Sequence, residues 1–184
     1  MRFEKYAILS LAGEHAKESF NQIIQRKKKD IENVGYTFWL ENSYKTTPDK
    51  VQTFYGIANK EGIELNCLLY LGDTQDTTHN TQAKEYSVNK RSWIKIDSKL
   101  SPITGKMSEN THALVFDKLD SENMDLNLEN YVEFDSETPI RNYPNASTFC
   151  SIKKHDSIIA KNPNNIRKIF AIGRIHKPSS VWLR

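Results

Sequence analysis

The sequence predicts an α/β protein, with a mixed α+β arrangement as the alternative, folded as a single domain over residues 1–184. The length of 184 residues fits one compact unit. Strand and helix patterns alternate over residues 1–72, which predicts a βαβαβ half. Residues 90–184 carry mainly strand patterns, and the polar segment 73–89 between the two parts is expected to be an exposed loop.

The first strand is predicted at the apolar run Phe3–Leu11, and Gly13 then ends the strand pattern. A long amphipathic helix follows, because apolar residues recur at three- and four-residue spacing between charged ones. Its apolar positions are Ala16, Phe20, Ile23, Ile24 and Ile31. Gly35 is expected to end this helix, and its basic run Arg26–Lys29 is expected to form a solvated face.

The second strand is predicted at Tyr36–Leu40, which is rich in aromatic and β-branched residues. Thr47-Pro48-Asp49 then predicts a helix start, with a capping oxygen, a proline at the first helical position and a carboxylate near the helix dipole. Gly62 ends this helix, and Ile63–Leu71 is the third strand. This order favours a parallel sheet with right-handed crossovers.

The second half of the chain is expected to be strand-rich, with turns at proline, glycine and asparagine residues. The expected strands are Ser92–Ile96, Ala113–Leu119, Tyr131–Phe134, Thr148–Ile152, Ile169–Ile175 and Val181–Leu183. Asp120–Asn130 is polar and is predicted to be a loop.

Composition places the chain among globular proteins, with 38% hydrophobic and 27% charged residues. The N-terminus lacks the pattern of a signal peptide, and no apolar stretch reaches the length of a membrane span, so a cytoplasmic location away from membranes is expected. Cys67 and Cys150 have no CxxC partner and are expected to be reduced core residues. The five histidines are scattered, so no metal site and no cofactor are predicted.

Cations and aromatic residues alternate just after the polar loop, in a pattern typical of nucleic-acid binding. The candidate binding residues are Lys84, Tyr86, Lys90, Arg91, Trp93 and Lys95. The alternative is that Trp93 points into the core while the neighbouring cations point to solvent. The net charge of +3 is compatible with a nucleic-acid partner and does not require one.

A phosphate site is the second candidate, because ligands of open parallel sheets lie beyond the carboxyl ends of the strands. Three segments would meet there: Ser10–His15, Glu41–Thr47 and Asp73–Asp76. The candidate phosphate-binding residues are Ser10, His15, Ser43, Tyr44 and Lys45, with Glu14 and Asp73 on the same rim. The alternative is that they are ordinary loop and cap residues, since no glycine-rich phosphate fingerprint is present.

Two catalytic patterns are weaker. Pro48-Asp49 and Asp97-Ser98-Lys99 resemble the parts of a PD-(D/E)xK nuclease motif, which needs carboxylates around a divalent ion. The helix-start role of Asp49 and the long separation of the fragments favour a structural explanation. Cys150 lies in a strand pattern with nothing near it to lower the pKa of its thiol, which favours a core cysteine over a nucleophile.

Parts of the chain resemble a known family. The segment Ile24–Phe54, with QRKKKDIENVGYTFWL and PDKVQTF, and the later runs HALVFDKL and IFAIGRI resemble small prokaryotic proteins of an uncharacterised family. That resemblance implies no activity and no catalytic residue. A weaker resemblance is to PUA-like domains, including the ASCH and EVE groups, which hold RNA or modified DNA bases on a compact barrel beside helices.

Together these patterns predict a non-catalytic module that binds nucleic acid or a nucleotide. One alternative is a metal-dependent phosphoesterase or nuclease, with Asp73 or Asp49 holding the ion and His15 or Lys45 contacting phosphate. Another is a protein-interaction module, such as a phage or host-defence inhibitor. The partner is therefore expected to be DNA, RNA or a protein.

Overall fold

One mixed sheet runs through the computed structural model, which describes residues 5–13, 17–72, 81–140, 149–153 and 163–184. The strands are β1 (Tyr6–Ala12), β2 (Thr37–Glu41), β3 (Asn66–Leu71), β4 (Glu85–Ser87), β5 (Ile94–Lys95), β6 (His112–Asn127), β7 (Tyr131–Glu133), β8 (Phe149–Lys153) and β9 (Ile166–Leu183). Their order is β2-β6-β9-β3-β1-β8-β7, and β4 joins β9 to β5. The α+β fold expected as the alternative is thus observed.

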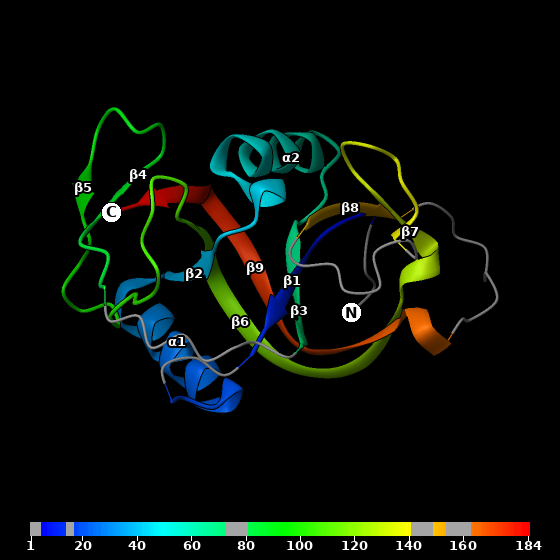
Figure 1. Cartoon of the computed structure of the whole chain (residues 1–184), viewed down its shortest axis with the longest axis horizontal. Coiled ribbons are helices and arrows are strands. Elements are labelled where there is room, and N and C mark those ends of the chain that lie inside the picture. The colour runs from blue at the N-terminus through cyan, green and yellow to red at the C-terminus, as the bar shows by residue number, and fades with distance from the viewer. Residues whose placement is uncertain (1–4, 14–16, 73–80, 141–148, 154–162) are drawn as a thin grey trace.

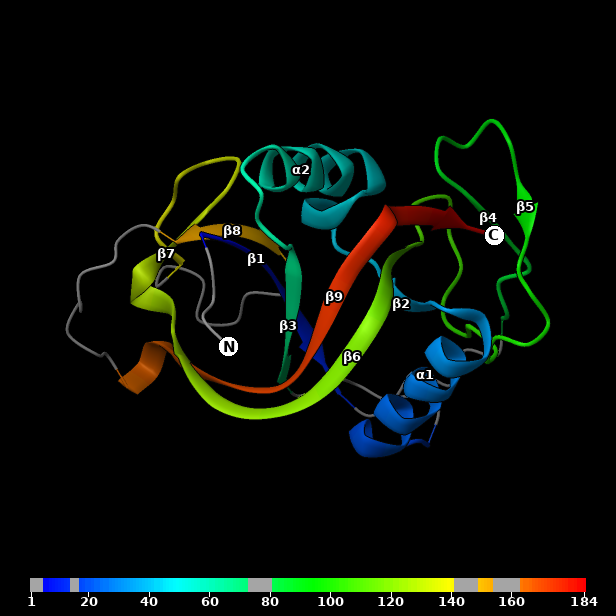
Figure 2. The ribbon, with the colours of Figure 1, turned by 180° about the vertical axis from the view of Figure 1, so that it is seen from behind.

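Two long strands, β6 and β9, form a curved antiparallel ribbon that runs across the molecule (Figures 1 and 2). They contain 16 and 18 residues, whereas strands of globular proteins rarely exceed about ten residues. Their register shifts at Leu114/Phe116, Phe116/Lys118 and Ser121/Met124. Such bulges bend a strand and increase its twist, which explains how so long a ribbon curves around one molecule.

The ribbon corrects two expectations. Most of Asp120–Asn130, predicted to be a loop, continues β6 and then forms the 3-10 helix η2 (Leu128–Asn130). Its apolar residues Met124, Leu126 and Leu128 alternate with polar ones, as a half-buried strand requires. The strands predicted at Ile169–Ile175 and Val181–Leu183 are parts of the single strand β9.

Helix α1 (Phe20–Val34) begins and ends at residues with clear capping roles. Ser19 accepts from the backbone of Gln22, and Gln22 accepts in turn from the backbone of Ser19, which forms a capping box. Gly35 ends the helix with φ 92°, a left-handed conformation that favours glycine. The predicted end is therefore confirmed.

Helix α2 (Pro48–Lys60) begins at the predicted proline, with Asp49 in its first turn. The 3-10 helix η1 (Tyr44–Thr46) precedes it. Thr47 occupies the N-cap position, but its side chain makes no capping hydrogen bond. Pro48 and the helix dipole, rather than the Thr47 hydroxyl, therefore account for this helix start.

Three apolar clusters stabilise the fold. The first joins both helices to the inner strands and includes Ile24, Phe54 and Phe116. The second packs β1, β3 and β9 against the segment around Tyr131. The third lies between β2, β6, the end of β9 and the segment that contains Ala83. Alternate residues of β1 belong to the first and the second cluster, so apolar side chains pack on both faces of the sheet.

The strand order differs from the predicted parallel arrangement in one respect. β1 and β3 pair in parallel, as expected. β2 lies at the far edge of the sheet and pairs antiparallel with β6, so β9 and β6 separate it from β3. Alternating strand and helix patterns predict the sequence of elements, but they carry no information on which distant strand is inserted between them.

The predicted exposed loop at residues 73–89 is also shorter than expected. Its residues 73–80 lie outside the described part of the chain, but Glu85–Ser87 form strand β4. Ala83 and Ser87 are buried. In the described ranges, no helix combines the length and apolar character needed to cross a membrane.

Helix α1 carries a buried ion pair where the sequence predicts a solvated face. Lys27 is buried and its Nζ lies 3.7 Å from Asp30 Oδ2. Removal from water lowers the pKa of Lys27 to about 8, against the attraction of Asp30. Lys27 follows Ile23 and Ile24 at four- and three-residue spacing, so it belongs to the helix face that is buried.

We expect Gly173→Ala to lower the free energy of unfolding by about 1–3 kcal/mol through overpacking. A Cβ atom at this position would lie 2.6 Å from Cδ2 and Cε2 of the Phe116 ring. That ring is fully buried and stacks on Trp39, with centroids 6.0 Å apart. Urea unfolding of the two proteins measures the difference.

The double variant Gly173→Ala/Phe116→Leu should lose less than the sum of the two single changes, because the smaller side chain makes room. Gly56→Ala, in helix α2, is the matched control, because its added Cβ would meet no neighbouring atom within 4 Å. It should be neutral or stabilising. A Gly173→Ala protein as stable as the parent would show that Phe116 moves without cost.

Candidate nucleic-acid interface

The hairpin β4–β5 carries most of the predicted nucleic-acid-binding residues at one end of the molecule (Figure 1). β4 pairs with the last residues of β9, where Tyr86 lies opposite Leu183 and Ser87 opposite Trp182. β5 pairs with β4 through Glu85–Lys95 and Tyr86–Ile94. The end of the chain is therefore brought beside a hairpin that is distant from it in sequence.

The turn of the hairpin is fixed by the Asn89 side chain. Its Oδ1 accepts from the backbone N–H of Arg91 at 2.9 Å and from that of Ser92 at 3.3 Å. Lys90, which lies between Asn89 and Arg91, has a left-handed φ of 61°. An asparagine side chain that mimics a backbone acceptor is a common way to fix such a turn. It holds Lys90 and Arg91 at defined positions.

This hairpin and the adjoining end of β9 carry exposed cations and one partly exposed tryptophan. We call the set the hairpin surface: Lys84, Lys90, Arg91, Trp93, Lys95 and Arg184. The Lys84, Arg91 and Lys95 side chains are exposed and form no ion pair within the described residues. They are therefore available to an anionic partner.

Two of the cations lie on tryptophan rings. The Arg184 guanidinium lies 4.2 Å from the centre of the Trp93 ring, and its Nε donates to Glu85 at 2.8 Å. Lys90 Nζ lies 3.8 Å from the centre of the Trp182 ring and donates to the carbonyl of Glu109 at 2.7 Å. Cation–π contacts of this kind hold the charged groups in place.

Tyr86 differs from the other predicted residues of this set. Its ring packs at 5.3 Å from that of Phe38 and belongs to the third apolar cluster. Tyr86 therefore anchors the base of the hairpin, because its strand position directs it toward the core. Tyr86 is partly buried, as Trp93 is, and its predicted role in nucleic-acid binding stays a prediction. Trp182 was missed, since its contact with Lys90 depends on the pairing of β4 with β9.

The predicted phosphate rim is assembled only in part. Ser10 Oγ donates to Glu41 Oε1 at 2.5 Å, so two of the three predicted segments do meet, although both residues lie within β1 and β2. Gly72 N donates to Ala12 O at 3.1 Å, which places the ends of β1 and β3 side by side. His15, Glu14 and Asp73–Asp76 lie outside the described residues.

The burial of this rim argues against a phosphate there. Ser10 and Glu41 are both buried, and the Glu41 carboxylate occupies the position next to the hydroxyl. Lys45 Nζ contacts Glu133 Oε1 at 2.6 Å in a pair that is mostly shielded from water. Carboxylates beside Ser10 and Lys45 would repel an anion. The predicted phosphate-binding role of these two residues is therefore corrected.

The remaining rim residues have local roles. Ser43 Oγ accepts from the backbone N–H of Lys45 at 3.3 Å and caps η1. Tyr44 is 74% exposed and lies beside the Lys45 ammonium, 5.8 Å from ring centre to nitrogen. Ser43 thus fits the alternative prediction of a cap residue, and Tyr44 is the one rim residue of the described set that faces solvent.

Titratable groups in the described ranges offer little for metal or nucleophilic chemistry. No group of three or more His, Cys, Asp and Glu residues there lies close enough to hold a metal ion. His112 is buried with Nδ1 at 2.7 Å from the carbonyl of Asn110, and burial lowers its pKa. The imidazole is therefore neutral at pH 7 and acts as a core residue.

The two cysteines flank the same residue of β1. Ile8 pairs with Cys67 on β3 and with Cys150 on β8. Because neighbouring strands are about 4.8 Å apart, the two Cα atoms are separated by about 10 Å, beyond the reach of a disulfide. Cys67 is buried, as the predicted core role requires.

Comparison of the chain with protein-family models, with curated proteins and with solved structures finds no match. The resemblances suggested by the sequence stay predictions.

Proposed function

We propose that this protein binds single-stranded nucleic acid through the hairpin surface. The observation that carries the proposal is the partly exposed Trp93, which has Arg184 on its ring and lies in a hairpin with the exposed cations Lys84, Arg91 and Lys95. Cations neutralise the phosphates of a strand, and an aromatic face stacks on its bases. A hairpin that places both kinds of group together is suited to such a ligand.

Single strands are favoured over duplex for a geometric reason. The hairpin carries its tryptophan on a short two-stranded element, with residues Ile94 and Lys95 exposed beside it. A base must leave its duplex stack before it can contact the flat side of an indole ring, which costs energy that an unpaired base does not require. Arg184, on the same ring, extends the stack with a planar cation.

Fluorescence anisotropy with labelled single- and double-stranded DNA and RNA tests this function. We expect binding of single strands at about 50 mM salt and much weaker binding at about 200 mM, because phosphate contacts release counterions. Absence of binding to every probe at the lower salt would refute the proposed function.

Trp93→Ala should weaken single-strand binding by about 1–3 kcal/mol, the usual contribution of one base–aromatic stack. The ring is partly exposed, so the fold should persist. Tyr44→Ala is the matched control, because it removes an aromatic ring that is 74% exposed and lies outside the hairpin surface. Equal affinity losses in both variants would show that stacking at Trp93 is not specific.

A further inference from the structure

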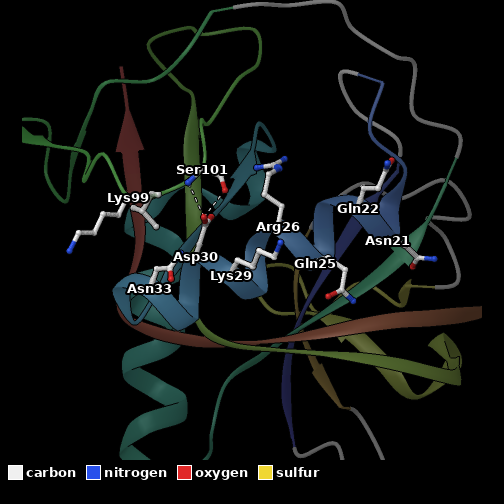
Figure 3. A pocket seen from close by; sticks show the side chains of 10 residues that line it. Asn21, Gln22, Gln25, Arg26, Lys29, Asp30, Asn33, Lys99 and Ser101 are labelled. Atoms are coloured by element: carbon white, nitrogen blue, oxygen red, sulfur yellow. Dashed lines mark hydrogen bonds between the residues drawn. The ribbon is translucent and has the colours of Figure 1, made fainter.

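An open groove of about 600 Å³ lies along the outer side of α1, where residues 99–101 form its second wall. Figure 3 shows the side chains of Arg26, Lys29, Asn33, Lys99 and Ser101 around it. Nine of its ten lining residues have polar or charged side chains, among them the amides of Asn21, Gln22 and Gln25. Amide and cationic groups together suit a ligand that carries many hydrogen-bond acceptors.

The charge of the groove is positive. Arg26, Lys29 and Lys99 line it, and Asp30 is its one acidic lining residue among those described. The Asp30 carboxylate is already occupied: Oδ1 accepts from Ser101 N at 2.8 Å and from Ser101 Oγ at 2.6 Å. Its charge is also balanced by the buried Lys27. The groove therefore presents cations to a ligand without a competing free carboxylate.

Arg26 has a donor that the folded chain leaves unused. Its Nε and Nη2 donate to the Glu18 carboxylate at 3.0 Å and 2.6 Å. Its Nη1 is buried and has no hydrogen-bond partner within the described residues. The guanidinium is thus neutralised by Glu18, and Lys29 and Lys99 are the exposed groove cations that form no ion pair among the described residues.

A short segment of chain connects the hairpin surface to the groove. Lys99 follows Lys95 by four residues, which limits the distance between their Cα atoms to about 14 Å. The intervening turn is fixed, because Asp97 Oδ1 accepts from Lys99 N at 2.9 Å and Asp97 O from Leu100 N at 3.1 Å. Figure 1 places β5 and α1 toward the same end of the molecule.

We propose that the α1 groove binds the phosphodiester backbone of the strand whose bases contact Trp93. The inference rests on the proposed function and extends it from one stacking ring to a continuous track of cations. Lys95 and Lys99 lead from the hairpin to Lys29, and the ammonium group of each lysine can pair with a phosphate as a point charge.

The test is the salt dependence of single-strand binding by Lys29→Gln/Lys99→Gln, measured by anisotropy from about 50 to about 200 mM salt. Both side chains are exposed, so the fold is retained. Loss of two phosphate contacts should reduce the slope of log K against log salt by about 1.4, since each contributes about 0.7 with single strands. The affinity loss across that salt range then becomes about sevenfold smaller than in the parent.

Lys60→Gln/Lys168→Gln is the matched control, because both lysines are exposed and neither lines the groove. Lys60 lies at the end of α2 and Lys168 near the start of β9. It should keep the parental slope. The groove proposal would be overturned if the slope of Lys29→Gln/Lys99→Gln equalled that of the parent, or if the control variant lost as much slope. In either case, single-strand binding by the parent would still support the hairpin surface. Absence of binding by the parent itself would instead refute the proposed function.

Discussion

Asp30→Ala should lower the free energy of unfolding by about 3–5 kcal/mol, the usual cost of leaving one partner of a buried ion pair alone. Asp30 is 2% exposed and holds three elements together. Its Oδ2 accepts from Thr37 Oγ1 at 2.8 Å on β2, and its Oδ1 accepts from Ser101. The change would leave the Lys27 ammonium and the hydroxyl donors of Thr37 and Ser101 without their partner. Urea unfolding at pH 7 measures it.

Lys27→Met is the informative partner variant. It removes the buried cation and leaves Asp30 with its hydrogen bonds to Thr37 and Ser101, so its loss should be smaller than that of Asp30→Ala. Equal losses, or an Asp30→Ala loss below about 1 kcal/mol, would show that Asp30 does not hold these elements together.

The same pair of proteins has a defined pH dependence. Burial lowers the pKa of Lys27 in the folded protein to about 8, from 10.5 for a lysine in water. Between these values the unfolded chain binds more protons, so stability rises with pH. The parent should therefore gain stability relative to Lys27→Met as the pH increases from about 7.5 to about 9.5. A constant or falling difference would contradict the burial of a charged Lys27.

The second large effect is expected on binding. Arg91→Glu/Lys95→Glu should weaken single-strand affinity about 100-fold at low salt, because two charge-assisted phosphate contacts, each of about 1.5 kcal/mol, are lost. Both side chains are exposed and form no ion pair among the described residues, so the fold should not change. Anisotropy titration measures the affinity, and circular dichroism checks the fold.

Lys60→Glu/Lys168→Glu changes the net charge equally, at exposed positions outside the hairpin surface. Its affinity should fall far less, since contacts beyond about 10 Å are screened at 0.1 M salt. If both double variants bind equally poorly, the effect is one of net charge and the hairpin surface has no special role.

Local signals in the sequence account well for the elements that were predicted. Gly35 adopts the left-handed conformation that favours glycine, and Pro48 occupies the first position of α2. These residues act through their own backbone geometry, so their effect can be recognised without knowing the rest of the fold. Local signals of this kind, together with the periodicity of apolar residues, predict the helix ends and most strand positions.

Non-local pairing explains most of what the sequence did not predict. Nothing within Tyr36–Leu40 specifies that β2 will pair with β6 rather than with β1. The same is true of Arg184 and Trp182, which reach the hairpin only because β4 pairs with the end of β9. The interleaved cations around Trp93 were visible in the sequence, but their full environment depends on the order of the strands.

Two misinterpreted segments did contain a usable signal. Met124, Leu126 and Leu128 alternate with polar residues, which is the pattern of a strand with one face buried. Lys27 lies on the same helix face as Ile23 and Ile24, so its spacing indicates burial although its charge suggests exposure. In both cases periodicity was the better guide than polarity.

The most direct test of the nucleic-acid interface is the intrinsic fluorescence of the parent protein during titration with a single-stranded oligonucleotide. Of the three tryptophans, Trp39 and Trp182 are buried and only Trp93 is partly exposed. Stacking on a base should therefore quench emission in the parent and leave the emission of Trp93→Phe nearly unchanged. The proposed contact would be contradicted if the oligonucleotide bound the parent without quenching its tryptophan emission. It would also be contradicted if the emission of Trp93→Phe were quenched equally.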